Sequence, residues 1–372
     1  MPGYPKGWII SADFNFQHMS KQDNYIRLWL WAGIVLIALM VVVGGITRLT
    51  GSGLSIVEWN VISGTIPPLT DAQWQHAFDQ YKQFPQYKKM NYGMDMAGFK
   101  QIFFWEYLHR LLGRFIGFVF IVPFLVFYFG RKLSKPLMKK VLVIFALGAL
   151  QGFMGWYMVK SGLNDNPHVS HFRLAMHQGL ALLLIVSIWW ALLEPDGRKA
   201  AGKDSRPPLL LPAIVSVVLL SLQIILGAFV AGLKAGFSYT NFPFMGDSFF
   251  PPKFVVEVQP YLYNGVMLQF THRWLAFVVL LSFFWILKIS KPYREVRKYA
   301  TWLVVVASLQ VVLGITTLVL HVPIALGVAH QFLAIALLMI MVRIIHAVKY
   351  PENAGGEGHE VPAREALHHG QA

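Results

Sequence analysis

Stretches of about 20 mostly apolar residues recur along the chain, and each is long enough to cross a bilayer as an α-helix. Polar or basic segments separate eight of them, at residues 26–47, 101–129, 141–159, 171–193, 208–232, 263–287, 299–320 and 323–346. An even number of spans places both termini on one side of the membrane. The pattern predicts an all-α integral membrane protein with eight transmembrane helices.

The last four spans repeat polar positions of the first four. Glu106-Tyr-Leu-His109-Arg110 in the second span aligns with Gln269-Phe-Thr-His272-Arg273 in the sixth. His177-Gln178 in the fourth span aligns with His330-Gln331 in the eighth, and Gln151 with Gly155 in the third aligns with Gln310 and Gly314 in the seventh. We therefore expect two repeated four-helix bundles in the same orientation, each with a site in its core.

The domain boundaries follow from these spans. We expect an amino-terminal bundle at 26–194 with a long outer loop at 48–100, and a carboxy-terminal bundle at 208–349. A cytoplasmic linker at 195–207 joins the bundles, and cytoplasmic tails occupy 1–25 and 350–372.

Basic residues predict the orientation in the membrane. The chain has 32 Lys and Arg against 18 Asp and Glu, a formal net charge of +14. The loops 130–140, 195–207 and 288–298 are much more basic than the opposite loops, so by the positive-inside rule they and both termini face the cytoplasm. This accounts for the charge without a nucleic-acid partner. The first 24 residues match neither a signal peptide nor a transit peptide, which favours a bacterial inner membrane.

Composition narrows the chemistry that is open to the chain. At 56% hydrophobic and 13% charged residues, the sequence cannot build the surface of an ordinary soluble domain. The absence of cysteine excludes disulfides, zinc–thiolate sites and iron–sulfur clusters. Thirteen histidines are then the main candidates for redox or metal chemistry.

Four histidines lie at one predicted depth in the outer half of the bilayer. His109, His177, His272 and His330 are each about six to nine residues from the outer end of a span, or roughly 9–14 Å deep. In each half, two imidazoles from different helices can face each other across a flat ligand and bind its metal axially, which suits iron porphyrin. The alternative is a set of histidines that form hydrogen bonds between helices.

Charged residues beside the histidines suggest further roles. Arg110 and Arg273 each follow a candidate ligand, and haem propionates would give each arginine an anion. The alternative is pairing with backbone carbonyls, and Arg48 and Arg114 raise the same question. Glu106 lies three residues before His109, on one helix face, where the second copy has neutral Gln269. One site is therefore equipped for chemistry and the other for holding a cofactor, unless Glu106 only pairs with an arginine.

At these residues the sequence resembles the haem A synthase family, in the branch shared by mitochondria and many bacteria. The resemblance covers about residues 25–346. Its motifs are Gly44-Gly-Ile-Thr-Arg-Leu-Thr-Gly-Ser-Gly-Leu-Ser55, Trp59, Pro67-Pro68, Glu106-Tyr-Leu-His-Arg-Leu-Leu-Gly-Arg114, Gly155-Trp-Tyr-Met-Val-Lys-Ser-Gly162, Leu226-Gly-Ala-Phe-Val-Ala-Gly232 and His330-Gln331.

The resemblance implies a membrane oxidoreductase that oxidises the C8 methyl group of haem O to a formyl group, making haem A for cytochrome oxidase. It implies that His109 and His177 flank the substrate haem, that His272 and His330 bind haem b, and that Glu106 is catalytic. The implied partners are haem O synthase, cytochrome oxidase assembly proteins and an electron-transfer protein of unknown identity; a homo-oligomer is left open. The cysteine pair of some family members is absent.

Two other classes of protein remain open at this stage. An electron carrier of the cytochrome b kind would place both histidine pairs on the same two helices, whereas here each helix supplies one histidine. A membrane haem carrier or exporter could use the same histidines without oxidising its cargo, and Glu106 argues against it. The haem species made from haem O would discriminate between these classes.

Overall fold

The computed structural model describes residues 21–59, 63–163, 167–193, 208–252 and 259–351, and these ranges hold helices and no strand. The predicted linker at 195–207 lies outside the described residues, as do nearly all of the tails predicted at 1–25 and 350–372. The predicted orientation of the termini is therefore not tested by the structure.

Eight of the described helices are long and apolar enough to cross a membrane, as the sequence predicts. They are α1 (Lys21–Leu49), α4 (Met96–Phe129), α5 (Lys135–Gly162), α6 (His171–Leu193), α7 (Leu210–Gly232), α9 (Gly265–Ile289), α10 (Arg294–Val319) and α11 (Ile324–Lys349). Several begin before the apolar run. Helix α5, for example, starts at Lys135 because the side chain of Ser134 caps it by accepting a hydrogen bond from the Leu137 N–H.

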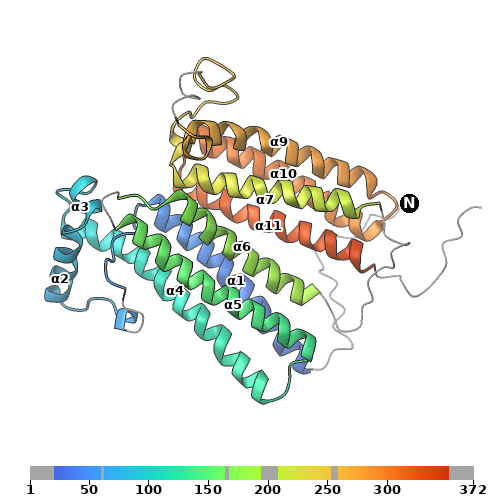
Figure 1. The fold of residues 1–372 in the computed structure, drawn as a ribbon, viewed down its shortest axis with the longest axis horizontal. Helices are drawn as coiled ribbons and strands as arrows, with labels where there is room; N and C mark the ends of the chain where they lie inside the picture. The colour runs from blue at the N-terminus through green and yellow to red at the C-terminus, as the bar shows by residue number, and fades with distance from the viewer. Residues whose placement is uncertain (1–20, 60–62, 164–166, 194–207, 253–258, 352–372) are drawn as a thin grey trace, which may run out of the picture.

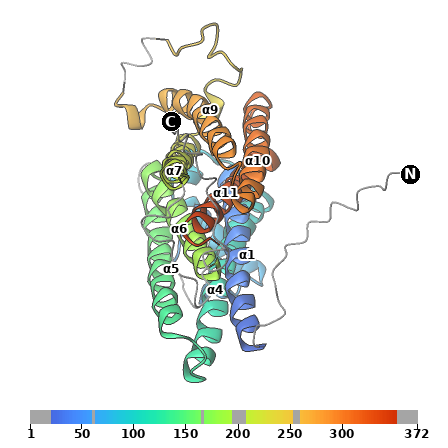
Figure 2. The ribbon, with the colours of Figure 1, turned by 90° about the vertical axis from the view of Figure 1, so that its right-hand side faces the viewer.

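The long helices lie in two groups (Figure 1). Helix α1 packs on α4 and α6, and α5 packs on α6; in the second group α7 packs on α9 and α11, and α10 packs on α9 and α11. Helices α6 and α11 join the groups, because α6 contacts α7 and α11 contacts both α1 and α6. Figure 2 shows the molecule turned by 90°, with α11 and α6 near its centre. That the two groups are repeats of one unit stays a prediction.

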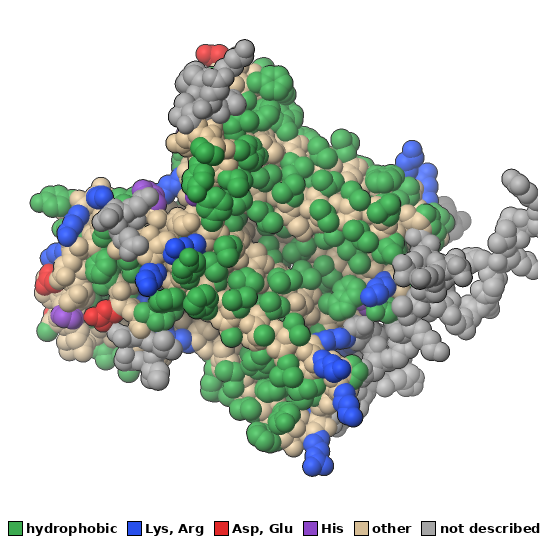
Figure 3. Space-filling model, viewed as in Figure 1, with side chains coloured by type: hydrophobic (Ala, Val, Ile, Leu, Met, Phe, Trp, Pro, Cys, Tyr) green, Lys and Arg blue, Asp and Glu red, His purple; other side chains and the backbone are tan. Residues whose placement is uncertain are grey.

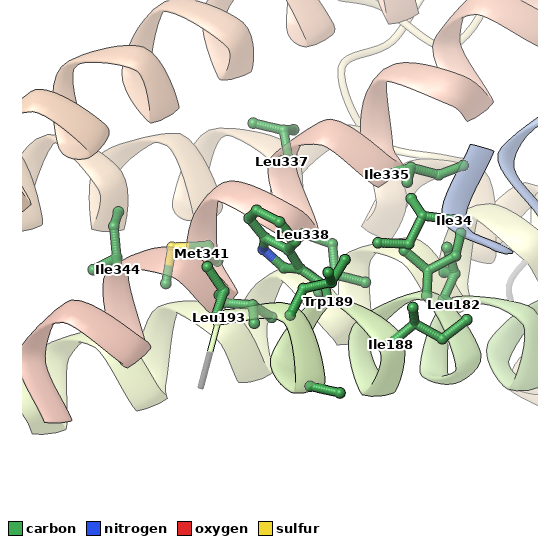
Figure 4. Packing of buried hydrophobic residues seen from close by; sticks show 14 of the residues in the cluster. Ile34, Leu182, Ile188, Trp189, Leu193, Ile335, Leu337, Leu338, Met341 and Ile344 are labelled. Carbon is green, nitrogen blue, oxygen red and sulfur yellow. The ribbon is translucent and has the colours of Figure 1, made fainter. Parts of the chain in front are cut away.

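A continuous apolar core fills the junction of the groups. Figure 4 shows buried side chains that α1, α6 and α11 contribute to it, among them Ile34, Leu182, Ile188, Ile335 and Met341. On the face that Figure 3 shows, most side chains along the long helices are also apolar, and Lys and Arg lie toward both ends of the helices. An apolar exterior with charged ends is the surface expected of helices that cross a bilayer.

The segment predicted as a long outer loop at 48–100 contains two short helices, α2 (Asp71–Lys82) and α3 (Pro85–Lys89). Thr70 and Gln73 form a capping box at the start of α2. Apolar residues of α2 pack against the outer end of α4, where Phe78 stacks on Phe99 with ring centroids 4.9 Å apart. This small cluster covers the end of the first group of helices at which α4 begins.

Candidate haem sites

The four predicted site histidines come from four different helices. His109 lies on α4, His177 on α6, His272 on α9 and His330 on α11. All four side chains are partly buried, and in each the Nδ1 atom is buried and has no hydrogen-bond partner among the described residues. Buried polar atoms without partners are rare in folded proteins, and they mark places where a ligand or water completes the site.

A glycine on a neighbouring helix lies against each of these imidazoles. A Cβ atom added at Gly44 would lie 2.9 Å from Cε1 of His109, and one at Gly155 would lie 3.0 Å from Cε1 of His177. The matching distances are 2.9 Å from Gly227 to His272 and 2.8 Å from Gly314 to His330. Real Cβ atoms essentially never approach this closely, so any other residue would push the ring aside. The glycines therefore fix where the four imidazoles lie.

His272 and His330 face each other at a spacing that suits a shared metal. Their ring centroids are 6.5 Å apart and the ring planes cross at 75°. With a metal–nitrogen bond of about 2 Å and roughly 1 Å from nitrogen to ring centre on each side, two axial imidazoles have centroids about 6 Å apart. The described residues hold no group of three or more His, Cys, Asp or Glu that could bind a metal ion. A two-histidine set fits a metal whose other ligands come from a macrocycle.

Glutamines lie on the same helix faces as three of these glycines. Gln151 precedes Gly155, Gln223 precedes Gly227 and Gln310 precedes Gly314 by four residues, which is one helical turn. The Gln310 amide donates a hydrogen bond of 2.9 Å to the carbonyl of His330, and the Gln223 amide donates one of the same length to the carbonyl of His272. The Gln223 amide thus ties α7 to α9, and the Gln310 amide ties α10 to α11, both at the level of the histidines.

Glu106 is buried in α4, with 3% of its surface exposed, and its carboxylate has three donors. One oxygen accepts hydrogen bonds of 2.8 Å from the Ser55 hydroxyl and from the Ile56 N–H. The other oxygen lies 2.6 Å from the Arg110 guanidinium. The pairing with a neighbouring arginine that the sequence left open is therefore present, and it fixes the carboxylate one turn from His109.

Arg110 also holds the chain that follows α1. Its guanidinium donates hydrogen bonds to the carbonyls of Ile56 and Glu58, at 2.7 and 2.8 Å, and lies 4.8 Å from the ring centroid of Trp59. Arg48, at the end of α1, donates to the carbonyl of Ala231 on α7 at 3.1 Å. Both arginines thus bind backbone carbonyls, the alternative stated above, and binding to propionates stays a prediction for Arg110.

The second group of helices uses matching positions to hold its own outer loop. Gln269 donates a hydrogen bond of 2.9 Å to the carbonyl of Tyr239, and Arg273 donates to the same carbonyl at 2.5 Å. Arg273 also donates to the carbonyls of Asn241 and Phe244. The direction of these hydrogen bonds differs between the groups. Glu106 accepts hydrogen bonds from its loop, whereas Gln269 donates one to its loop. A role of Arg273 toward a propionate likewise stays a prediction.

A separate open cavity of about 620 Å³ lies near the outer ends of α5, α6 and α7. Ser161, His168, His171 and Tyr263 are among its lining residues, and none of the four site histidines lines it. Burial lowers the pKa of His168, and the nearby positive charge of Lys234 adds to this effect. The side chain of His171 is 9% exposed, with Nε2 3.0 Å from the carbonyl of Leu262.

The sequence matches a known family over nearly all of the region that holds the eight long helices. A family model described as cytochrome oxidase assembly protein matches residues 27–342. The chain belongs to this family. Members from three bacteria cover most of this chain, and each is named haem A synthase. The protein of Nitrosospira multiformis is 44% identical over 337 residues, which make up 87% of this chain and 93% of the relative.

Two further relatives are similar over the same region. The protein of Flavobacterium johnsoniae is 42% identical over 341 residues, covering 88% of this chain and 99% of the relative. That of Bradyrhizobium diazoefficiens is 41% identical over 355 residues, covering 92% and 97%. The family assignment made from the sequence is confirmed.

Sequence reasoning missed several residues of the sites in this family member. It did not assign Ser55 as a donor to Glu106, and it did not pair the four glycines with the four histidines. A signal for the glycines was present, because Gln-x-x-x-Gly occurs in the third, fifth and seventh spans, each directly before or after a span that carries a site histidine. The signal for Ser55 was absent, because it lies 51 residues from Glu106.

Proposed function

We propose that this chain performs the haem A synthase reaction, the oxidation of the C8 methyl group of haem O to a formyl group. Membership of the cytochrome oxidase assembly family and the names of relatives 41–44% identical to the chain support the proposal. The structural observation that carries it is a glycine-packed histidine pair in each group of helices, with a buried carboxylate beside the histidine of only one group.

In the second group, we assign His272 and His330 as the residues that would hold haem b through its iron. The 6.5 Å spacing of their rings, their unpartnered Nδ1 atoms and the glycines at 227 and 314 all suit this assignment. When bound, the haem would supply one-electron redox chemistry. The chain's part is to hold the two imidazoles, and Gln223 and Gln310 lock the helices that carry them.

In the first group, we assign His109 and His177 as the residues that flank the substrate haem, and Glu106 as the catalytic group. The Ser55 hydroxyl and the Ile56 N–H orient one carboxylate oxygen, and the Arg110 guanidinium pairs with the other. A fixed negative charge at this place can stabilise positive charge that develops on the substrate, or accept a proton from it. The matching Gln269 offers neither.

We infer an inner-membrane protein with its termini in the cytoplasm and its haem sites toward the outer face, because the basic loops lie at the opposite helix ends. Haem O synthase would supply the substrate, cytochrome oxidase assembly proteins would receive the product, and a separate electron-transfer partner would exchange electrons with the second site.

Alanine substitutions of the four histidines test this proposal. We expect His272→Ala and His330→Ala to remove or strongly weaken the low-spin haem b absorbance of purified protein, since a six-coordinate iron loses an axial ligand. His109→Ala and His177→Ala should keep most of this absorbance but stop formation of haem A, measured in haem extracts of cells that make haem O. Equal loss of haem b in all four variants would refute the assignment of the two sites. If the wild-type protein binds haem O but does not convert it to haem A, the protein is a haem carrier.

A further inference from the structure

The two groups of helices differ at one interface. In the second group α9 packs closely against α10, but in the first group the matching helices α4 and α5 are not among the closely packed pairs. Contact between α4 and α5 is present toward their cytoplasmic ends, where the Phe145 ring lies 5.4 Å from Phe120 and 4.8 Å from Phe124, measured between centroids. Toward the histidines, the same faces of both helices carry glycine.

Helical periodicity puts these glycines on the facing sides of α4 and α5. Gly113 and Gly117 each lie seven residues before one of the two phenylalanines of α4, and Gly152 lies seven residues after Phe145. Residues seven apart share one face of a helix. A Cβ atom at Gly117, Gly148 or Gly152 would find no described atom within 4 Å beyond its own helix backbone and chain neighbours, whereas one at Gly113 would lie 3.4 Å from Cε of Met40 on α1. The interface is therefore open beside the glycines.

The second group fills the same positions with side chains. In the register set by His109 and His272, Gly113 and Gly117 correspond to Ala276 and Leu280. In the register set by Gln151 and Gln310, Gly148 and Gly152 correspond to Ala307 and Val311, and Ala307 is only 4% exposed. Both groups carry large apolar residues deeper in the membrane, so the difference is confined to the part nearest the histidines.

The open space begins beside the first histidine pair. Gly113 lies one turn beyond His109 on α4, and Gly152 follows Gln151, whose amide nitrogen lies 3.5 Å from Nε2 of His177. Gln151 Oε1 is buried and, like Nδ1 of both histidines, has no hydrogen-bond partner among the described residues. From Gly152 to Phe145 along α5 the space extends seven residues, or about 10 Å toward the middle of the bilayer.

We propose that the space between α4 and α5 holds the isoprenoid tail of the substrate porphyrin and thereby selects haem O for the first site. This inference rests on the proposed function. The two sites must receive iron porphyrins that differ mainly in this tail, and the open α4–α5 interface accepts it whereas the filled α9–α10 interface excludes it. The isoprenoid part of the tail is hydrocarbon, so a space lined by glycine and apolar side chains can hold it without polar partners.

Variants that copy the second group test the proposal. Gly117→Leu and Gly152→Val introduce the side chains that Leu280 and Val311 place at the matching positions. The protein, purified with its haem b, is titrated separately with haem O and with tail-less iron protoporphyrin, and binding is followed by absorbance. We expect affinity for haem O to fall by about tenfold or more, while affinity for protoporphyrin changes less than about threefold. Haem b content should stay at the wild-type level.

Gly179→Phe in α6 is the matched control. Gly179 also has no described atom within 4 Å of an added Cβ, its counterpart is Phe332, and it lies two residues from His177 and so on nearly the opposite face. This variant should bind both porphyrins as the wild type does. If Gly117→Leu or Gly152→Val loses haem b through misfolding, Gly148→Ala, which adds only one methyl group, is used as the test variant instead.

The outcomes separate this inference from the proposed function. Unchanged binding of haem O in the filled variants, with conversion to haem A intact, would mean that only lipid occupies the space and would overturn the tail site alone. Parallel loss of both porphyrins would overturn it as well. Wild-type protein that neither binds nor converts haem O would overturn the proposed function, and the tail site with it.

Discussion

Each site histidine depends on the missing side chain of a glycine across the helix interface. The distances of 2.8–3.0 Å from a would-be Cβ to the imidazole carbon leave no room for even a methyl group. In an ordinary membrane helix, glycine allows two backbones to approach closely. Here the glycine additionally sets the position of a ring on the next helix, and this makes it a positioning residue for the proposed iron ligands.

Gly314→Ala should therefore weaken haem b binding although alanine is the better helix former. Alanine is favoured over glycine in a helix by about 1 kcal/mol, so loss of the haem cannot arise from a weaker α10. The added methyl group would displace His330 from its place opposite His272. The ratio of haem b absorbance to protein should drop several-fold, whereas Gly179→Ala, made in open space, should leave it unchanged. A normal ratio in Gly314→Ala would show that the ring can move freely.

Glu106→Gln separates a catalytic role from a structural one. The amide oxygen can still accept from Ser55 and Ile56, and Arg110 keeps the carbonyls of Ile56 and Glu58. Folding and haem b content should survive, because the matching position already holds Gln269. A step that needs the charge or proton should slow by about 10² or more, and haem O or a partly oxidised haem should accumulate.

The ratio of haem O, hydroxylated haem and haem A in extracts of cells that express the variant measures this effect. Ser55→Ala is the companion variant, since it removes one donor to the carboxylate but keeps the charge. We expect a smaller decrease in haem A from Ser55→Ala than from Glu106→Gln. A wild-type ratio in Glu106→Gln, at equal protein level, would leave the carboxylate with the purely structural role that its pairing with Arg110 also permits.

At the scale of elements, the outer helices α2 and α3 are tied to the end of α1 by a chain of hydrogen bonds. Asn91 donates to the Tyr81 hydroxyl at 2.7 Å, this hydroxyl donates to Gln86 Oε1 at 3.1 Å, and the Gln86 amide donates to the carbonyl of Gly51 at 2.8 Å. Burial raises the pKa of Tyr81, so its hydroxyl stays protonated and can donate. Gly51 has φ of +67°, a conformation that favours glycine.

Tyr81→Phe should loosen this connection without affecting the membrane helices. The change leaves the Asn91 donor and the Gln86 acceptor without their shared partner, at a cost of about 1–3 kcal/mol in local stability. Limited proteolysis of the purified protein should cut faster between residues 71 and 95, while haem b absorbance remains unchanged. Tyr87→Phe is the control, since the Tyr87 ring packs on the same cluster. Equal rates of cleavage in both variants would contradict the proposed tie.

The sequence predicted all eight membrane helices because their signal is local, an apolar run about as long as the bilayer is thick. It did not predict α2 and α3, because their apolar residues pack on α4 rather than follow a long run of their own. The same limit applies within the sites. The depth of His109 in its helix and its distance from Glu106 could be predicted from their positions within one apolar run. The contact of Ser55 with Glu106 could not, because it joins segments about 50 residues apart.

At the scale of the whole molecule, the two groups of helices are joined along their length. The buried core passes from α1 and α6 into α11, where Trp189 donates a hydrogen bond of 3.0 Å to the carbonyl of Met339. At the other end of the junction, Arg48 of α1 donates a hydrogen bond to the carbonyl of Ala231 on α7. Because both ends of this junction are bonded, we expect the two proposed haem sites to keep a fixed separation during turnover.

Orientation in the membrane can be measured by cysteine labelling, since the native chain has no thiol. Lys88 lies on α3, at the helix ends nearer the proposed haem sites, and Lys139 lies near the start of α5, at the opposite helix ends. By the positive-inside rule, Lys88→Cys should react with an impermeant maleimide on intact spheroplasts, whereas Lys139→Cys should react only after the membrane is opened. Both variants should retain haem b. The reverse labelling pattern would place the basic loops and the termini outside, and would move the proposed haem sites to the cytoplasmic half of the bilayer.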